Sequence, residues 1–481
     1  MVITANAPKF DKRQPSRGDY DAIVYIDGSQ VIAEDSNGRK IASGVAGTDD
    51  AAVINSVLMV AVSGYVIKFG KGAFVINSAL TIPSNTPVSV VGSGFGTMFI
   101  TPASSANVIF SGVSVYKCIF TDFAISSGVG STGNLFDFQN SAIHCLFDHL
   151  YIRDIAVGGY AINIKKGSGT SSPYENIITR CSCNCLSGYA GTTYVLYYAG
   201  SELYIYGNKF ANSAIRLGGS GYANIYDNIF ENASLVAESS TVLKMCDNQF
   251  SCSGASMTGV KCITVYNYVD AIVCNNCIVG GGYALDGIAL TGSTSNSTFI
   301  GNIVTGCMNG LKEYGTNNFN IIAENNFGGN TNPLIKVGAN DVVKDNIGRI
   351  VPGESRSASG LLTAGSADAI AFAWHNPELQ DILVKKVTIR ITTPGGTAGS
   401  LLDVGIADDA AGTNLGTEFF DDVDLNTAAI VKSTVATPGT QTVEVFCQDS
   451  VSATDGWIVG QILVANAASL AGSYYIEYEG A

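Results

Sequence analysis

One short phrase returns along this chain at intervals of 20 to 28 residues. A period of this length is typical of a solenoid, in which each repeat forms one coil and stacks on the next. Weaker copies precede the clear ones, and in "NIITRCSC" Cys181 stands where the others have asparagine. The clear copies are "LYIYGNKF", "ANIYDNIF", "LKMCDNQF", "AIVCNNCI", "STFIGNIV", "NIIAENNF" and "DVVKDNIG", with the shared residues Asn208, Asn228, Asn248, Asn276, Asn302, Asn325 and Asn346.

Apolar residues flank each shared asparagine at fixed distances. One stands three residues before it, as Ile205 and Ile225 do, and another two residues after it, as Phe210 and Phe230 do. The interval between them is five, so a straight strand with its period of two cannot turn both toward one core. We therefore expect a bend at the asparagine, which tolerates left-handed backbone, and a ladder of amides hydrogen-bonded between coils. The alternative of separate βα units lacks helix-period segments between the strands.

The segment 47–100 supports the same architecture. It begins with Asp49 and Asp50 and continues through "TIPSN" to "VVGSGFG". This stretch resembles the opening of the pectate-lyase-like superfamily of right-handed parallel β-helices, which includes viral tailspikes and receptor-binding proteins. The resemblance implies an all-β coil closed by an N-terminal helix. The helix's apolar face would consist of Val53, Ile54, Val57, Leu58 and Ala61.

The domain plan follows from changes of pattern along the chain. Residues 1–46 are expected to be an N-terminal extension or attachment segment, 47–350 the β-helix, and 351–481 a C-terminal β-sandwich, jelly-roll-like. In this last part short alternating segments such as "ILVKKVTIRITT" and "GSYYIEYEG" replace the repeats. The Pro/Gly/Ser-rich stretch from 351 would be a linker or a first strand.

Charge and hydropathy limit the partners. The chain has 26 basic and 40 acidic residues, a formal charge of −14, and this argues against nucleic acid, whose phosphates need clustered cations. No run of eighteen apolar residues and no secretory leader is visible, so we expect no membrane insertion. Assembly in a host cytoplasm would fit both, and the acidic composition fits an exterior component of a virion.

Twelve cysteines allow three interpretations. "CSCNC" at 181–185 and "CNNC" at 274–277 look like pairs of metal ligands, but no second pair with histidine lies at zinc-finger spacing. Disulfides are a second interpretation. Structural thiols in a reducing compartment are preferred, with no metal and no cofactor expected.

Acidic residues beside the ladder are the first candidates for chemistry. Asp227 and Asp247 would lie about 5 Å apart on adjacent coils, as a retaining glycosidase pair does. Glu324 and Asp345 occupy the same place further on. They could instead contact a cation or a sugar, or be solvated turn residues, and the last interpretation is preferred. No catalytic residue is assigned.

Known catalytic signatures of the superfamily are incomplete here. "FDH" at 147–149 resembles part of a pectate-lyase motif, but the arginine motif that accompanies it is absent. The polygalacturonase series is absent as well. His144 and His149 fall near one coil and are expected to have surface or packing roles.

Tyrosines give the last candidate site. From the inward parity of Ile205 and Ile225, the side chains of Tyr204, Tyr206 and Tyr226 should point outward, with the last two on successive coils. Exposed stacked tyrosines can bind sugar rings, or they can stabilise the sheet or pack in a trimer. A glycan site of these tyrosines with Asp227 and Asp247 is the prediction.

The resemblance and the residues together favour a virion surface protein of the tailspike or receptor-binding kind. It would be a homotrimer that attaches to host polysaccharide and joins other virion proteins through its N-terminal segment. A polysaccharide lyase or glycoside hydrolase on the same scaffold is the alternative. A secreted or cell-surface adhesin is a third.

Overall fold

The structure, a computed structural model, describes residues 20–480 with short gaps. The residues outside the description, beside 1–19 and 481, are 107, 129–130, 132, 156–158, 166–172, 185–193, 220, 239–241, 336–337, 339, 348–354, 379–380, 396–397, 434–444, 449–453 and 465–466. Two compact units are present, and each is described by itself. Three expectations fall partly or wholly outside the described residues. They concern Cys185, residues 1–19 of the expected N-terminal segment, and the expected boundary at 350.

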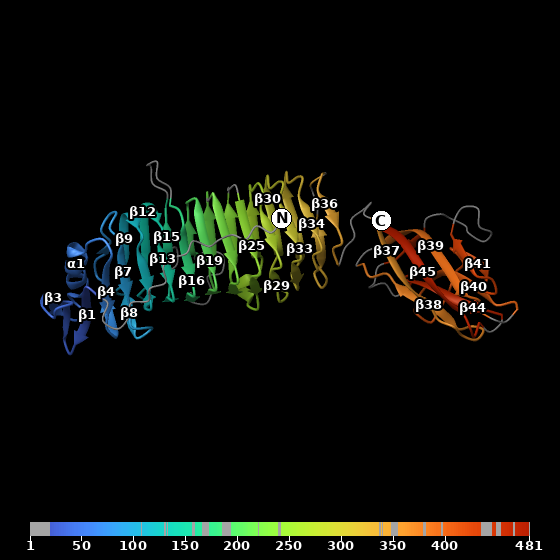
Figure 1. Ribbon diagram of the computed structural model, residues 1–481, viewed down its shortest axis with the longest axis horizontal. Helices are drawn as coiled ribbons and strands as arrows, with labels where there is room; N and C mark the ends of the chain where they lie inside the picture. The colour runs from blue at the N-terminus through green and yellow to red at the C-terminus, as the bar shows by residue number, and fades with distance from the viewer. Residues whose placement is uncertain are drawn as a thin grey trace. The chain divides into compact units, whose positions relative to one another are not determined.

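The first unit is a right-handed parallel β-helix whose coils each contribute a strand to three sheets, named A, B and C here (Figure 1). In sheet A the order through β31 is β3 (Lys40–Val45), β2 (Gln30–Asp35), β1 (Ala22–Asp27), β4 (Tyr65–Phe69), β7 (Val88–Val91), β10 (Ile119–Thr121), β13 (Leu146–Asp148), β16 (Asn176–Thr179), β19 (Glu202–Tyr206), β22 (Tyr222–Tyr226), β25 (Val242–Cys246), β28 (Ile272–Cys274) and β31 (Thr298–Ile300). Two short strands, β34 (Ile321–Ala323) and β36 (Val342–Lys344), follow in the chain.

Sheets B and C have the same parallel order. Sheet B consists of β5 (Gly72–Val75), β8 (Thr97–Ile100), β11 (Ala124–Ser126), β14 (Tyr151–Arg153), β17 (Ser182–Asn184), β20 (Lys209–Ala211), β23 (Ile229–Glu231), β26 (Gln249–Ser251), β29 (Cys277–Val279) and β32 (Ile303–Thr305). Sheet C consists of β6 (Leu80–Thr81), β9 (Phe110–Tyr116), β12 (Phe136–Ile143), β15 (Tyr160–Ile164), β18 (Tyr194–Tyr198), β21 (Ala214–Gly218), β24 (Ser234–Glu238), β27 (Lys261–Tyr266), β30 (Asp286–Gly292), β33 (Asn309–Gly315) and β35 (Asn332–Ile335). A short 3-10 turn, Ala255–Met257, interrupts one coil.

The described residues 22–45 contribute three strands to sheet A. Strands β1, β2 and β3 form an antiparallel meander, and β1 pairs in parallel with β4. The helix α1 (Asp50–Val60) packs beside these strands and buries Val53, Ile54, Val57 and Leu58. It ends before Ala61, which was expected on its apolar face. The Asp50 carboxylate is buried and accepts hydrogen bonds from the backbone N–H groups of Gly47 and Val75.

The interior of the coils is filled by stacked apolar side chains. Phe210, Phe230 and Phe250 follow one another on sheet B, with ring centroids 5.2 and 4.2 Å apart. Ile205 and Ile225 lie on sheet A, across one corner of the same coils, and both are fully buried. The apolar residues that the repeat predicted to point inward are therefore the ones that the structure buries.

Asparagines form a hydrogen-bonded row between sheets A and B. The Asn208 side-chain amide and its backbone N–H both donate to Asn228 Oδ1, at 3.0 and 3.1 Å. The same two bonds join Asn228 to Asn248, Asn248 to Asn276, Asn276 to Asn302 and, in the second unit, Asn325 to Asn346. Each of these side chains is buried.

The left-handed residue of this corner is not the asparagine, which corrects the expected bend. It is the residue immediately before, because the asparagine side chain must turn inward to bond its neighbours. Asp227 and Asp247 have φ of 55° and 61°, and Gly207 has 65°. The left-handed residues at this place in the repeat are Asp122, His149, Arg180, Gly207, Asp227, Asp247, Asn275, Gly301 and, in the second unit, Glu324 and Asp345.

The second unit holds two antiparallel sheets around one core. One sheet has the order β37 (Ser355–Leu362), β45 (Ala471–Gly480), β39 (Ile382–Thr393) and β42 (Ala429–Lys432), with β43 (Val445–Cys447) also on β39. The other has β38 (Ile370–His375), β44 (Trp457–Leu463), β40 (Leu401–Ala407) and β41 (Phe420–Asp424). Ile389 and Ile476 of the first sheet and Val404 and Ile462 of the second belong to the same buried cluster, so this unit is a β-sandwich.

Candidate functional site on the outer face of sheet A

The three tyrosines expected to point outward lie together on strands β19 and β22. Tyr206 and Tyr226 are partners in the parallel register, and their rings stack with centroids 5.1 Å apart and planes 9° from parallel. Tyr204 meets Tyr222 with ring centroids 6.0 Å apart. All four side chains are half-buried, so part of each remains open to solvent.

Partial burial raises the pKa of three of these phenols, those of Tyr204, Tyr222 and Tyr226. Burial is the main reason that the pKa of Tyr226 is raised, and the neighbouring Tyr206 and Asp227 raise it further. The pKa values of Tyr204 and Tyr222 are raised by burial first and by the Glu202 carboxylate second. The hydroxyl groups therefore remain available as both donors and acceptors of hydrogen bonds.

An arginine held by a carboxylate adjoins this pair. Arg180, one coil earlier, donates from Nε to Asp148 Oδ1 at 2.7 Å and from Nη2 to Asp148 Oδ2. Its side chain is 59% exposed, whereas that of Asp148 is 13% exposed. The bonds to Asp148 are the main reason that the pKa of Arg180 is raised, and the Asp122 carboxylate raises it further, while partial burial lowers it. Asp148 thus fixes the direction of a cation beside the tyrosine pair.

A histidine and a carboxylate form a second pair at the same corner. His149 Nδ1 lies 2.6 Å from Asp122 Oδ1. The Phe95 ring packs against both the His149 and Tyr151 rings, with centroids 5.1 and 5.3 Å away. The paired carboxylate fixes the ring orientation of His149 and leaves Nε2 as the nitrogen for another contact.

Two buried polar atoms near the tyrosines have no hydrogen-bond partner among the described residues. They are Thr179 Oγ1 and Asn224 Oδ1, in side chains that are 5% and 6% exposed. Thr179 is the register partner of Tyr206, and Asn224 that of Tyr204. A buried polar atom without a partner is costly, so both atoms favour an added hydroxyl group.

Asp227 and Asp247, the expected acidic partners of the tyrosines, lie exposed in the left-handed corner column. Aspartate is one of the few residue types with a side chain that tolerates this backbone, which accounts for its presence without catalysis. Asp227 directly follows Tyr226, and Asp247 holds the same place one coil further on, after Cys246.

The outward column that carries Tyr206 and Tyr226 continues with a disulfide. Cys246 is the register partner of Tyr226, and it is bonded to Cys274 of the next coil. The preference for free thiols is therefore wrong at this pair, because two outward cysteines on adjacent coils face each other directly. The other described cysteines are outside any disulfide, and Cys252 and Cys262 have sulfurs 3.2 Å apart.

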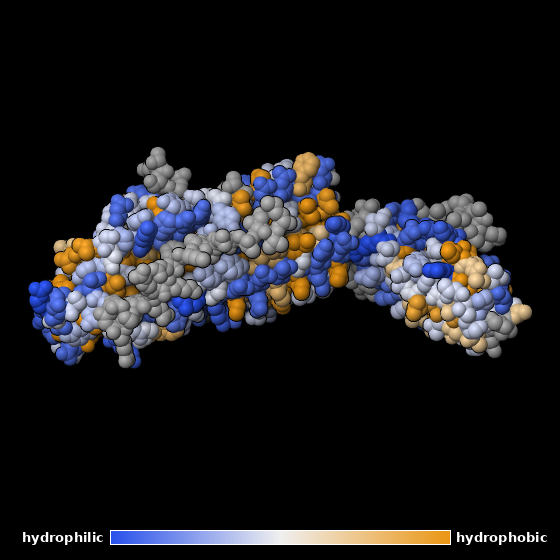
Figure 2. Space-filling view, viewed as in Figure 1, coloured by the Kyte–Doolittle hydropathy of each residue, from blue (hydrophilic) through white to orange (hydrophobic). Residues whose placement is uncertain are grey.

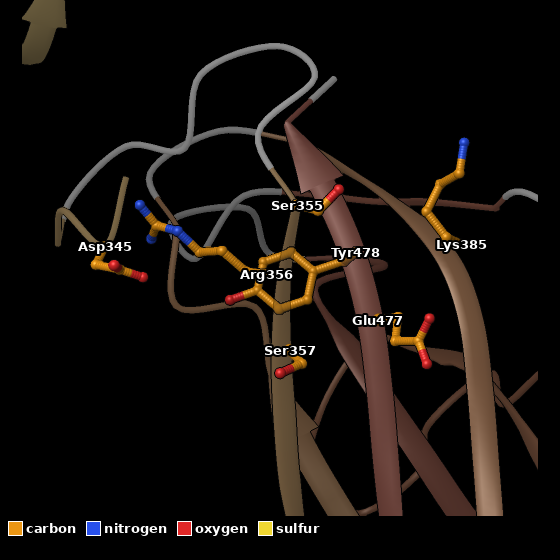
Figure 3. A pocket seen from close by; sticks show the side chains of 7 residues that line it. All are labelled: Asp345, Ser355, Arg356, Ser357, Lys385, Glu477 and Tyr478. Carbon is orange, nitrogen blue, oxygen red and sulfur yellow. The ribbon is translucent and has the colours of Figure 1, made fainter. Parts of the chain in front are cut away.

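The second unit offers a cavity of about 480 Å³ (Figure 3). It is lined by Asp345, Ser355, Arg356, Ser357, Lys385, Glu477 and Tyr478. Arg356 bonds Glu378 at 2.5 Å and Lys385 bonds Glu479 at 3.3 Å, so both cations already have carboxylate partners. In the same unit Asp403, Asp421 and Asp422 offer oxygens within 4.8 Å of one another. Burial and the other two carboxylates raise the pKa of Asp403.

Sequence reasoning missed the Asp148–Arg180 pair. Asp148 lies in the "FDH" phrase that was noticed, and Arg180 precedes Cys181 at the weak repeat. The available signal was the basic residue Arg180 just before the ladder position, where most later coils have Gly, Asp or Asn.

Comparisons with known proteins bear on the fold alone. No protein-family model matches the chain, and no curated protein matches it in sequence. Similar solved structures include a tailspike protein mutant of E. coli bacteriophage HK620, 10% identical, covering 86% of this chain and 87% of that one, with a TM-score of 0.44. A mannuronan C-5 epimerase A-module of Azotobacter vinelandii is 13% identical, covering 62% and 95%, with a TM-score of 0.35. An alginate lyase from Paenibacillus is 16% identical, covering 61% and 95%, also with a TM-score of 0.35.

Proposed function

We propose that this chain is a virion surface protein of the tailspike or receptor-binding kind, which attaches to host cell-surface glycans through the outer face of sheet A. The observation that carries the proposal is the stacked, half-exposed pair of Tyr206 and Tyr226, with Arg180 directly after Thr179, the register partner of Tyr206. Flat aromatic faces accept the C–H side of a sugar ring, while the phenol, guanidinium and amide groups bond its hydroxyl groups.

The elements of this site have separate tasks. The tyrosine pair would hold one sugar ring, and Arg180, oriented by Asp148, would donate to hydroxyl or carboxylate oxygens of the next. Asn224 Oδ1 and Thr179 Oγ1 would each accept or share one further hydrogen bond. Asp227 and Asp247 would contact the glycan at the edge of the site, where solvent weakens the contribution of each carboxylate.

Self-association into a homotrimer is part of the proposal. The later coils carry aliphatic side chains on their outer surface, among them Ile272 and Ile303, which are 40% and 49% exposed. Figure 2 shows orange, hydrophobic areas over this part of the β-helix. Exposed apolar side chains on neighbouring coils favour association with a second protein surface. Attachment of residues 1–46 to other virion proteins remains a proposal, and a cellular adhesin is the alternative location. No described helix has the length and apolarity to cross a membrane.

The test is binding of the whole protein to purified host-surface polysaccharide. The double change Tyr206→Ala with Tyr226→Ala should weaken binding about tenfold or more, because it removes the stacking surface. Tyr266→Ala, an exposed tyrosine of sheet C, is the matched control and should change nothing. Asp227→Asn should also leave attachment intact. Unchanged binding by the double variant, together with a loss of trimer in sedimentation, would instead assign the tyrosines to subunit packing.

A polysaccharide-degrading enzyme is the second candidate, and the His149–Asp122 pair favours it. A histidine oriented by a carboxylate beside a fixed arginine is the arrangement of a general base with a neighbouring cation. Release of reducing ends or unsaturated uronides from host polysaccharide would reveal such an activity. It should then fall by about 10²-fold or more in His149→Gln. Absence of any product from the wild-type protein excludes this candidate for that polysaccharide.

A further inference from the structure

A second group of tyrosines lies on the outer face of sheet C, away from the sheet A face. Tyr160 of β15 and Tyr194 of β18 are register partners, and their rings stack with centroids 5.9 Å apart and planes 23° from parallel. The Tyr197 ring completes the group, 5.5 Å from that of Tyr160. All three side chains are half-buried, so they present an aromatic surface across two coils.

Arg216 of the next coil lies over these rings. Its guanidinium carbon is 5.8 Å from the Tyr194 centroid and 6.0 Å from the Tyr197 centroid. Arg216 Nε also donates to Glu238 Oε2 at 2.9 Å. The arginine is thus held between an aromatic cluster and a carboxylate, and its charge is balanced.

A polar row continues the same outward column. Asp137, Asn163, Tyr197 and Arg216 are successive register partners on β12, β15, β18 and β21. Asn163 Nδ2 donates to Asp137 Oδ1 at 2.5 Å, and Gln139 Nε2 donates to Asp137 Oδ2 at 3.0 Å. Carboxylate and amide groups beside aromatic rings are the usual means by which proteins hold sugar hydroxyl groups.

One atom of this row points to a ligand independently. Asn163 is fully buried, and its Oδ1 has no hydrogen-bond partner among the described residues. It belongs to the residue beside Tyr197 in the register. An acceptor left in this state favours a donor such as a hydroxyl group.

Gly218 makes room for the tyrosine. A Cβ atom built on Gly218 would lie 3.1 Å from the Tyr197 hydroxyl oxygen, so the Tyr197 side chain lies across the glycine. A side chain at residue 218 would push the ring away from Tyr160. The ring group is therefore fitted to this backbone position.

From these contacts we infer a second carbohydrate-binding surface, selective for neutral hexose oligosaccharides. The rings supply stacking, and Asp137, Gln139 and Asn163 supply hydrogen bonds to hydroxyl groups. Neutral sugars are favoured because Arg216 is balanced by Glu238 and Asp137 adds a negative charge, which repels uronates and other acidic sugars. The inference rests on the proposed glycan-binding function but uses a different sheet and different residues.

The experiment measures the whole protein on an array of neutral hexose oligosaccharides beside uronate-containing oligosaccharides of matched length. The triple change Tyr160→Ala, Tyr194→Ala and Tyr197→Ala should lower affinity for neutral glycans about tenfold or more. Tyr197→Phe keeps the ring and should retain most of the binding. A thermal melt of each variant separates loss of binding from loss of folding.

The sheet A double variant, Tyr206→Ala with Tyr226→Ala, distinguishes the two sites. Retention of neutral-glycan binding by this variant, with loss in the sheet C triple variant, supports the inference even where the sheet A proposal fails. Three results would overturn the inference. They are unchanged neutral-glycan binding in a folded triple variant, preference of the wild-type protein for uronates, and no binding of neutral glycans by the wild-type protein.

Discussion

Early and late coils of the β-helix turn the same corner with different side chains behind it. In both, a left-handed residue precedes the corner, such as His149 early and Asp227 late. The next position holds Phe123 and Leu150 in early coils and Asn208 and Asn228 in later ones, and all four are buried. The left-handed residue is therefore common to all these corners, while the residue after it is apolar in the early coils and an inter-coil hydrogen-bonding amide in the later ones.

Cys181 stands at the junction and shows why the amides occur in a run. Its backbone N–H donates to Asn208 Oδ1 at 2.8 Å, although its own side chain carries no amide. Each asparagine Oδ1 accepts hydrogen bonds from the coil before it, and each Nδ2 donates to the Oδ1 of the coil after it. A single buried asparagine without asparagine neighbours would therefore have unsatisfied side-chain groups. The difference teaches that the ladder is a property of adjacent coils and not of one repeat.

The largest expected effect comes from exchanging the two corner types. Asn228→Leu removes the acceptor of two Asn208 groups and should lower the free energy of unfolding by about 4 kcal/mol. Leu150→Asn places an amide where the preceding coil has Phe123 and should cost about 3 kcal/mol. Denaturant unfolding measures both. If Leu150→Asn is neutral, the corner accepts isolated amides and the comparison fails.

Removal of the disulfide should have the next largest effect. Cys246 and Cys274 close a loop of 28 residues, so the double change to alanine should cost about 3.6 kcal/mol by the chain-entropy estimate. Cys277→Ala, which removes a half-buried free thiol on the neighbouring sheet, is the control. Equal melting temperatures with and without a reducing agent would show that the bond does not form.

A smaller effect tests the left-handed residue itself. Asp227→Val puts a β-branched side chain at φ 55° and should cost about 1–2 kcal/mol, whereas Asp227→Gly should change stability by less than about 0.5 kcal/mol. Thermal unfolding compares the two. A large loss in the glycine variant would mean that the carboxylate, not the backbone, matters there.

The smallest effect concerns thiols of the early coils. Burial raises the pKa of Cys118 to about 11 and of Cys181 to about 12. Since the unfolded chain releases these protons first, their contribution to stability is complete below about pH 9 and decreases as the pH rises toward 12. Iodoacetamide followed by peptide mass mapping should label Cys277 before either thiol in folded protein. Rapid labelling of Cys181 at pH 8 would contradict its burial.

Part of the corner was readable in the sequence and was assigned to the wrong residue. Gly, Asp or Asn precedes six of the seven ladder asparagines, and these are the residue types that tolerate left-handed backbone. The alternation of the strand residues placed the apolar positions inside and the tyrosines outside. It does not distinguish whether the asparagine or the residue before it has the left-handed backbone. Burial of the asparagine amide decided that.

The amino-acid sequence by itself determined which side chains turn inward, because strand parity and the asparagine phrase act over a few residues. Only the tertiary structure decided which side chains meet across coils. Asp148 and Arg180 are 32 residues apart and Cys246 and Cys274 are 28 apart, yet each pair is adjacent. The loops between strands differ in length from coil to coil, so sequence spacing does not fix which residues are neighbours. Strand pairing and packing set the register between coils, and no local sequence pattern encodes them.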